Sequence, residues 1–476
     1  MNRIVSAFRT TLSVALSVVL LGTLAGCGVD PTPGITDVPL PSEPRLEVGG
    51  VPHHDALAAR DAVLAGNAQG LLAAPSLVPP GAPLPPFVEA RLYAIVNVAM
   101  HDALNAIVPR FDRYADEGPM VRDAAIAAAV LTAAHDAIVG AAPGSQASID
   151  AWYAAAIANE AGTDGLAAGI ALGHRVAAAI LARRAHDGTD GGGVAPYTPG
   201  ATPGDYRFTF PFNTPGFDFF GTGGFADGSA WGTSVTPFVL SSASQFRAPR
   251  PYGALSNAAA VLTAQYTSDF NEVKALGCNT CASRTASQTE IARFWVESSP
   301  SAWNRIARTV ADKRNLDAWD AARLLALLQM GEFDAYASNF ESKYHYNFWR
   351  PVTAVALAGN DANPGTIPAA GWEVLAFPTP PVPDYPSGHA SAGGAAAAIM
   401  EAVVQGHGGP FTTTSASLPG VTRTFATVSD AATENALSRI YVGYHFRHAT
   451  DAGLTQGRAV GEFVAHSALR RRQRNH

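Results

Sequence analysis

Three short clusters of cationic, hydroxyl and imidazole side chains lie in the last third of the chain. They are KYHYNFWRP at 343–351, YPSGHA at 385–390 and SRIYVGYHFR at 438–447. Arginine and lysine side chains, together with the N–H groups at a helix N-terminus, are groups that proteins use to surround an oxyanion. If the clusters act together, the fold must bring three distant helix ends to one place.

The first cluster pairs Lys343 with Arg350. A helix through 324–350 would carry both side chains on one side, because seven residues are close to two turns and rise about 10.5 Å. Taken alone, such a pair is more often a solvated helix face than a binding site. Pro351 disfavours the helical conformation at the residue before it, so we expect the helix to end there.

The second and third clusters also suggest helix ends. Ser387 and Gly388 are expected to open a helix, with amide N–H groups and the positive end of the helix dipole facing an anion, although Ser-Gly-His is also an ordinary capping turn. Arg439 and His445 are six residues apart, with Gly443 between them, and do not share a helix face. We therefore expect Arg439 near a helix end and His445 beyond a local irregularity.

In this order and with these spacings, the three clusters resemble those of the vanadium-dependent haloperoxidases and the type-2 phosphatidic acid phosphatases, which share one fold and one site. The likeness extends in general texture over 53–467, and its specific part is 343–451. The resemblance implies an all-α fold of two related helical bundles packed together, with an irregular insert rich in glycine, proline and aromatic residues.

The resemblance also implies a role for each motif residue. The oxyanion would be bound by the side chains of Lys343, Arg350, Ser387 and Arg439 and by the amide of Gly388. His445 would be the apical group, which is a ligand to vanadium in a peroxidase and forms a phosphohistidine in a phosphatase. His389 would be the acid–base residue. Phosphatase relatives often carry an Asp four residues after the apical His, where this chain has Ala449, so the group that orients His445 stays open.

The N-terminus predicts export. Residues 1–27 combine a basic start, an apolar run and the sequence LAGC, which resembles a bacterial lipoprotein cleavage box. We expect Cys27 to be lipidated, so that the chain is anchored in a membrane and faces the periplasm or the cell exterior. An ordinary signal peptide with an incidental cysteine is the alternative. The proline-rich stretch 28–52 is expected to be a tether.

Helical spacing of alanine, leucine and valine predicts an N-terminal bundle over 53–185 and a C-terminal catalytic bundle over 285–470. Between them, 186–284 is expected to be an irregular insert whose aromatic residues either wall the active site or pad the bundle. Little alternating pattern is present, so little sheet is expected. A faint echo between NVAMHDALN at 97–105 and LLQMGEFDA at 327–335 suggests that the two bundles are related.

Two cysteines, Cys278 and Cys281, remain after Cys27. In an oxidising compartment this Cys-x-x-Cys is expected to form a local disulfide, since a zinc site would need two further ligands. A redox-active role would lack a thioredoxin-like βαβ context.

The pairs His101-Asp102 and His135-Asp136 invite interpretation as catalytic dyads. Adjacent residues on a helix point in different directions, so we expect roles in the bundle core or at the surface instead.

The leading functional interpretation is a vanadate-dependent haloperoxidase-type enzyme that oxidises halide with hydrogen peroxide. Trp349 before the arginine and the proline-rich approach to Ser387 favour this branch. Val382 stands where haloperoxidases usually carry an aromatic residue or histidine, which leaves the halide open.

Two alternatives remain. The chain could be an acid phosphatase that acts on a phosphomonoester, with no cofactor beyond the bound phosphate. It could also be a non-enzymatic lipoprotein that binds phosphate or vanadate, but both His389 and His445 would then be unnecessary. A net charge of −7 argues against nucleic acid as a partner. The sequence leaves open a homo-oligomer.

Overall fold

The computed structural model describes residues 51, 53–81, 84–189, 195–214, 226–227, 229–404 and 408–472. The predicted export signal, Cys27 and nearly all of the predicted tether lie outside these residues. Contacts divide the chain into Met1–Leu46 and Glu47–His476, and everything described below belongs to the second unit. The boundaries expected between bundles and insert stay a prediction.

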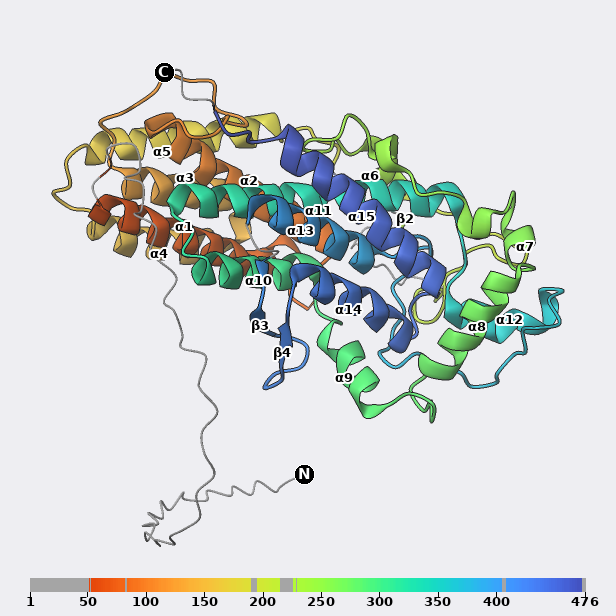
Figure 1. The fold of residues 1–476 in the computed structure, drawn as a ribbon. Coiled ribbons are helices and arrows are strands. Elements are labelled where there is room, and N and C mark those ends of the chain that lie inside the picture. The colour runs from red at the N-terminus through yellow and green to blue at the C-terminus, as the bar shows by residue number, and fades with distance from the viewer. Residues whose placement is uncertain are drawn as a thin grey trace, which may run out of the picture. The chain divides into compact units, whose positions relative to one another are not determined.

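Within the described part of the chain the fold is helical, as the sequence predicts (Figure 1). The first helices are α1 (His53–Ala73), α2 (Pro86–Ile107), α3 (Ile126–Ala141), α4 (Gln146–Ala158) and α5 (Leu166–Arg183). They pack as a bundle in which α3 contacts α1, α2, α4 and α5. By length and composition α5 could cross a membrane, as could α3 with α4 if that bent pair were one span, but all three pack here as bundle helices.

The second group of helices is centred on α11 (Ala318–Tyr346), which contacts α2, α10, α13 and α15, while other helices of the group pack on this inner set. The group also contains α6 (Ser229–Ser234), α7 (Asn257–Ala260), α8 (Ala264–Leu276), α9 (Ala286–Phe294), α10 (Ser299–Lys313), α12 (Pro351–Leu357), α13 (Gly388–Val403), α14 (Val428–Tyr441) and α15 (Arg447–Ser467). Every residue of α11 from Leu324 to Lys343 is buried. A helix buried on all sides is the core element of its bundle.

Small residues let α13 pack closely along α15. A Cβ at Gly457 would lie 1.9 Å from Ser391 O, and one at Gly461 would lie 2.5 Å from Ala395 O, so only glycine permits this approach. The Ser387 amide also donates to Ala449 O at 2.8 Å. The second and third sequence clusters are therefore brought together by backbone packing.

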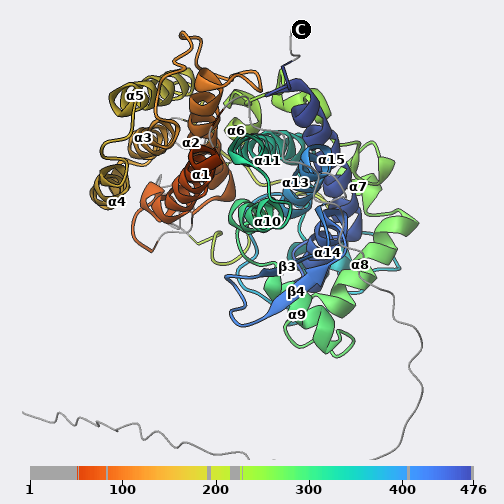
Figure 2. The same cartoon turned by 60° about the vertical axis from the view of Figure 1, so that its left-hand side comes forward.

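The central helices of the two bundles, α2 and α11, pack side by side (Figure 2). Each carries a buried aspartate that accepts hydrogen bonds from three consecutive backbone amides of a loop, which follows α2 in one case and precedes α11 in the other. Asp102 accepts from Tyr114 (2.8 Å), Ala115 (2.7 Å) and Asp116 (3.0 Å), and Asp334 accepts from Phe238 (2.6 Å), Val239 (2.8 Å) and Leu240 (3.0 Å). When Met100 is aligned with Met330, Asp102 lies opposite Glu332, so the sequence echo does not account for this likeness.

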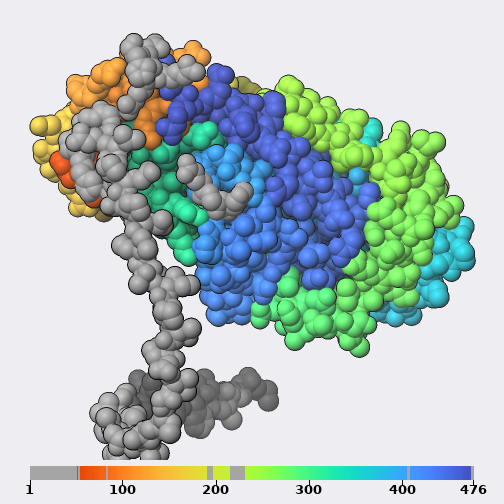
Figure 3. All heavy atoms as spheres, viewed as in Figure 1, coloured from red at the N-terminus to blue at the C-terminus, as the bar shows by residue number. Residues whose placement is uncertain are grey.

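The described residues contain two small antiparallel sheets, in agreement with the expectation of little sheet. One pairs β1 (Ala195–Pro196) with β2 (Ala226–Asp227), and the other pairs β3 (Phe411–Thr414) with β4 (Thr422–Phe425). The space-filling view places residues of the C-terminal helices beside α8 and α9 on one face (Figure 3).

Part of the insert pads the bundle, one of the two roles expected from the sequence. Trp231 is buried against Phe87 and Phe333 of the two central helices. Asp205 forms a bridge with Phe348, so another part of the insert lies along the chain that leads into Arg350. Phe210, by contrast, is 65% exposed, and Phe219 and Phe220 lie outside the described residues.

The predicted helix through 324–350 is wrong at its end. α11 ends at Tyr346, because Asn347 adopts a left-handed conformation with φ of 52°. Arg350 is instead the N-cap residue of α12, since Pro351 suits the first position of a new helix. Lys343 and Arg350 therefore do not share a helix face.

Candidate active site

All three sequence clusters meet in one buried group of side chains, despite this break. Lys343 lies in the last turn of α11, Arg350 precedes α12, and Arg439 lies in the last turn of α14. Each of these side chains is 2% exposed. The charges of all three act on His445, which is 4% exposed. We call this group, with Ser387, Gly388 and His389, the cage.

Lys343 is bound by the loop that precedes α13. Its Nζ donates to three carbonyl oxygens, those of Pro383 (2.7 Å), Asp384 (3.0 Å) and Pro386 (2.6 Å). Burial lowers the pKa of Lys343 well below its usual range, and the charge of Arg350 lowers it further. Through these three contacts Lys343 fixes the loop that carries Ser387.

Arg350 contacts His445 directly. Its Nε donates to Val382 O at 2.7 Å, and its Nη1 lies 2.9 Å from Tyr444 O and 2.8 Å from His445 Nε2. The same Nη1 lies 3.4 Å from His445 Nδ1, so Arg350 packs against the imidazole ring without singling out one nitrogen.

Two donors in the cage have no partner within the part of the chain that the structure describes. They are the hydroxyl Oγ of Ser387, which is fully buried, and Nε of Arg439. Ser387 is the N-cap residue of α13, yet its side chain makes no capping hydrogen bond. The ordinary capping turn left open by the sequence is thus absent, and the hydroxyl is available to another acceptor.

Arg439 is otherwise held in place. Its Nη1 donates to Trp295 O at 2.8 Å, and its guanidinium lies 4.9 Å from the centroid of the Tyr444 ring. Burial lowers its pKa to about 10, so it stays charged at neutral pH. No ion pair between a carboxylate and any of the three cage cations is present among the described residues. Buried charge without compensation is costly, and an anion would compensate it.

His389 faces the cage from the first turn of α13. Its Nε2 lies 3.1 Å from Glu297 O, the carbonyl before α10. Burial lowers the pKa of His389 well below its usual range, and the charge of Arg439 adds to this. The pKa of His445 is lowered in the same way, by burial first and then by Arg350. Both imidazoles are neutral at neutral pH and can accept a proton or a ligand bond.

Asp384 is a site residue that sequence reasoning missed. Its Oδ1 lies 2.9 Å from His445 Nδ1, and its side chain is 1% exposed. Burial raises its pKa to about 8, against the opposing charges of Arg350 and Lys343. The available signal was that Asp384 is the sole acidic residue in the run PPVPDYPSGH before and into α13. By contrast, Asp451, the acid nearest to the expected phosphatase position, is exposed.

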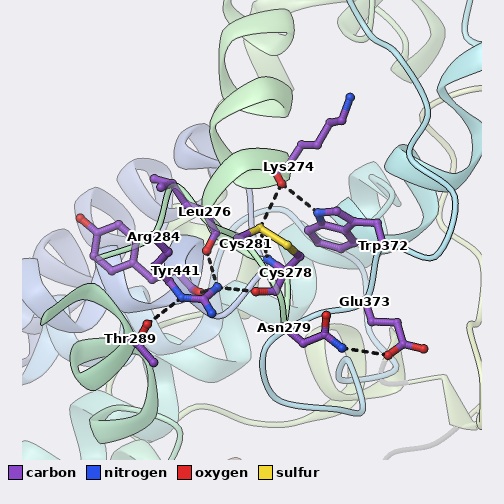
Figure 4. Close-up of a disulfide and its surroundings, with 10 residues drawn as sticks. All are labelled: Lys274, Leu276, Cys278, Asn279, Cys281, Arg284, Thr289, Trp372, Glu373 and Tyr441. Atoms are coloured by element: carbon purple, nitrogen blue, oxygen red, sulfur yellow. Dashed lines mark hydrogen bonds between the residues drawn. A yellow bond between two sulfur atoms is a disulfide. The ribbon is translucent and has the colours of Figure 1, made fainter. Parts of the chain in front are cut away.

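The Cys278–Cys281 disulfide lies next to the turn between Arg439 and His445 (Figure 4). Gly443 in that turn has φ of +87°, and a Cβ there would lie 2.5 Å from Gly277 O. The Arg284 guanidinium donates to carbonyls on both sides, those of Leu276 (2.6 Å) and Tyr441 (3.4 Å). The sequence predicts this bridge, and no cluster with metal-ligand character occurs among the described residues.

The two His-Asp pairs do contact within each pair, contrary to the expectation from helix geometry. Nδ1 of His101 lies 3.1 Å from Asp102, and Nδ1 of His135 lies 2.7 Å from Asp136. Asp102 is occupied with loop amides in the core. His135 also contacts Asp150 at 2.9 Å near the surface. Neither pair belongs to the cage.

Comparison with known proteins agrees with this geometry. Residues 323–474 match the family described as the VCPO second helical-bundle domain. A vanadium chloroperoxidase of Curvularia inaequalis is 27% identical over 222 residues, which cover 34% of this chain and 36% of that protein. The match thus spans about a third of the length of this relative.

Solved structures match over more of the chain. A bacterial vanadium-dependent iodoperoxidase aligns with a TM-score of 0.67 and 23% identity, over 88% of this chain and 98% of that one. The fold is that of the vanadium haloperoxidases. Apo and holo structures of a bacterial vanadium-dependent chloroperoxidase align with TM-scores of 0.64 and 0.63, each at 17% identity, over 81% and 82% of this chain and 94% and 93% of theirs. The resemblance to the superfamily that the three clusters suggest is confirmed.

Proposed function

We propose that this protein is a vanadate-dependent haloperoxidase. The observation that carries the proposal is the pair of buried, unpartnered donors, Ser387 Oγ and Arg439 Nε, beside three buried cations without a carboxylate ion pair. An oxyanion of tetrahedral or bipyramidal shape supplies what these groups lack, namely acceptors and negative charge. The residues present therefore fit vanadate.

Each cage residue has a part in this proposal. Ser387 Oγ, the Gly388 amide and the Arg350 and Arg439 guanidinium groups would hold the oxyanion, while Lys343 fixes the loop and adds charge. His445 Nε2 would be the ligand atom, since Nδ1 is in contact with Asp384. When bound, vanadate supplies Lewis-acid activation of hydrogen peroxide.

His389 would move the proton. Oxidation of a halide by hydrogen peroxide consumes one proton and gives hypohalous acid and water. A neutral imidazole of lowered pKa at the α13 N-terminus can take a proton from peroxide and return one to the departing oxygen. Val382 at the cage leaves the halide unassigned, and the iodoperoxidase likeness is one of fold alone.

An acid phosphatase is a second candidate, favoured by the short contact between Asp384 and His445. A carboxylate on the far nitrogen of an imidazole orients a histidine nucleophile. The same cage would then hold the phosphoryl group of a phosphomonoester, and His389 would protonate the leaving alcohol.

One experiment separates these functions. The purified protein, with and without orthovanadate, is assayed in parallel for peroxide-dependent halogenation of monochlorodimedone with chloride, bromide or iodide, and for hydrolysis of p-nitrophenyl phosphate. We expect halogenation with at least one halide, and a strict need for vanadate. Hydrolysis of p-nitrophenyl phosphate that vanadate inhibits, without halogenation by any halide, would favour the phosphatase. If the protein shows neither activity, the remaining candidate is a lipoprotein that only binds the anion.

We also propose that the chain is exported and lipid-anchored through Cys27, because LAGC follows an apolar run at the N-terminus. Mass spectrometry of the mature N-terminal peptide tests this. A diacylglyceryl-modified Cys27 is expected, and an unmodified N-terminus elsewhere would refute it.

A further inference from the structure

Asp384 makes contacts through its backbone that fix its position. Its amide donates to Phe348 O at 2.8 Å, and its carbonyl accepts from Lys343 Nζ at 3.0 Å. Its side chain is buried beneath His445, with Oδ1 2.9 Å from Nδ1. Neither carboxylate oxygen makes an aligned hydrogen bond with a described residue, His445 included, so the contact with Nδ1 is a close approach of the two buried groups.

Two buried side chains contact the His445 ring. Arg350 Nη1 lies 2.8 Å from Nε2 and 3.4 Å from Nδ1, so it packs against the ring without singling out one nitrogen. Asp384 Oδ1 lies 2.9 Å from Nδ1, so the carboxyl group contacts the nitrogen remote from the proposed ligand atom.

We propose that Asp384 is the positioning residue of His445. Resting on the proposed function, this role becomes decisive when an oxyanion binds. If Nε2 held the oxyanion, Asp384 would remain in contact with Nδ1 and would hold the ring in position. It fills the place left by Ala449, whose carbonyl is used by the Ser387 amide.

The proposal separates anions that need an apical bond from anions that do not. Vanadate would be bound by the cage donors and by His445 Nε2, whereas non-reacting inorganic phosphate needs the donors alone. Loss of a residue that orients a ligand typically costs about 10- to 100-fold in affinity. We expect Asp384→Ala to weaken vanadate binding by about this factor and to change phosphate binding by less than about 3-fold.

The test uses the full chain and measures equilibrium binding of orthovanadate and of phosphate by calorimetry. Asp361→Asn is the matched control, because Asp361 is likewise a buried aspartate, hydrogen-bonded to the Asn363 amide (2.9 Å) and to Thr366 Oγ1 (2.7 Å) outside the cage. Nitrogen-15 spectra of labelled histidine report the surroundings of Nδ1. We expect the Nδ1 resonance of His445 to shift in Asp384→Ala and to keep its wild-type position in Asp361→Asn.

The proposal would be overturned if Asp384→Ala bound vanadate with wild-type affinity. It would also be overturned if that variant lost affinity for vanadate and for phosphate by the same factor. An unchanged Nδ1 resonance of His445 in Asp384→Ala would overturn it as well. Failure of the wild type to bind either anion would instead refute the proposed function. The two failures are therefore distinguishable.

Discussion

Both bundles bury an arginine at 2% exposure, but the two arginines have opposite surroundings. Arg184, which follows α5, pairs with Asp187 at 3.0 Å and donates to Pro237 O and Thr236 O. Its guanidinium also lies 3.9 Å from the Phe238 ring centroid. Every polar group of Arg184 is directed to a protein partner, so this side chain is structural.

Arg439 in the other bundle has an aromatic neighbour and one carbonyl partner, but its Nε is unpaired and no carboxylate pairs with it among the described residues. The difference teaches how to separate a structural buried cation from a binding one. A structural cation is neutralised by the protein, whereas a binding cation is held in position and left without its counter-charge.

The central helices of the two bundles also differ, in how far each extends beyond its buried aspartate. Both α2 and α11 carry the aspartate that accepts three loop amides, but α2 ends five residues after Asp102, and α11 continues for twelve residues after Asp334. Lys343 lies on this extension. The proposed anion site therefore uses a part of α11 that has no counterpart in α2.

The largest expected effect concerns the two cage histidines. If anion binding belongs to the C-terminal bundle alone, His445→Ala should abolish measurable vanadate binding, because the apical ligand is gone. His389→Ala should retain vanadate and lose turnover by about 10²- to 10⁴-fold, the usual contribution of proton transfer. His135→Ala, in the N-terminal bundle, should change neither.

Calorimetry with orthovanadate and steady-state halogenation rates measure these outcomes. Equal loss of vanadate binding in the two cage variants would show that the assigned roles are wrong. An effect of His135→Ala on vanadate binding would show that anion binding does not belong to the C-terminal bundle alone.

The sequence predicted the cage because its three clusters depend on residue type and order, and neither requires the path of the chain between them. Helix ends were harder to predict. The break after Tyr346 depends on the left-handed conformation of Asn347, which few sequence patterns specify. Asp384 could not be assigned because its partner, His445, is 61 residues away and meets it only through the packing of α13 on α15. Contacts within His101-Asp102 were missed because side-chain rotamers, not helix direction, decide them.

A smaller effect distinguishes the two aspartates. Asp102→Ala and Asp334→Ala each leave three buried amides without an acceptor, which should cost about 3–5 kcal/mol of unfolding free energy. Denaturant titration should give similar losses for both. Vanadate affinity should fall only in Asp334→Ala, since α11 carries Lys343, and should stay at the wild-type value in folded Asp102→Ala. A matching loss of affinity in both variants would mean that the site depends on the whole fold.

The smallest expected effect concerns the Cys278–Cys281 disulfide, which lies next to the cage and is not part of it. Replacing Cys278 and Cys281 by serine opens a very short loop, which should reduce the unfolding free energy by about 2 kcal/mol. Because Gly277 O packs against Gly443, between Arg439 and His445, the same change should also weaken vanadate binding by roughly 10-fold or less. Asn279→Ala, which removes only the contact to Glu373, is the control that keeps the bridge. Lower stability with unchanged vanadate affinity would show that the bridge stabilises the loop without positioning the cage.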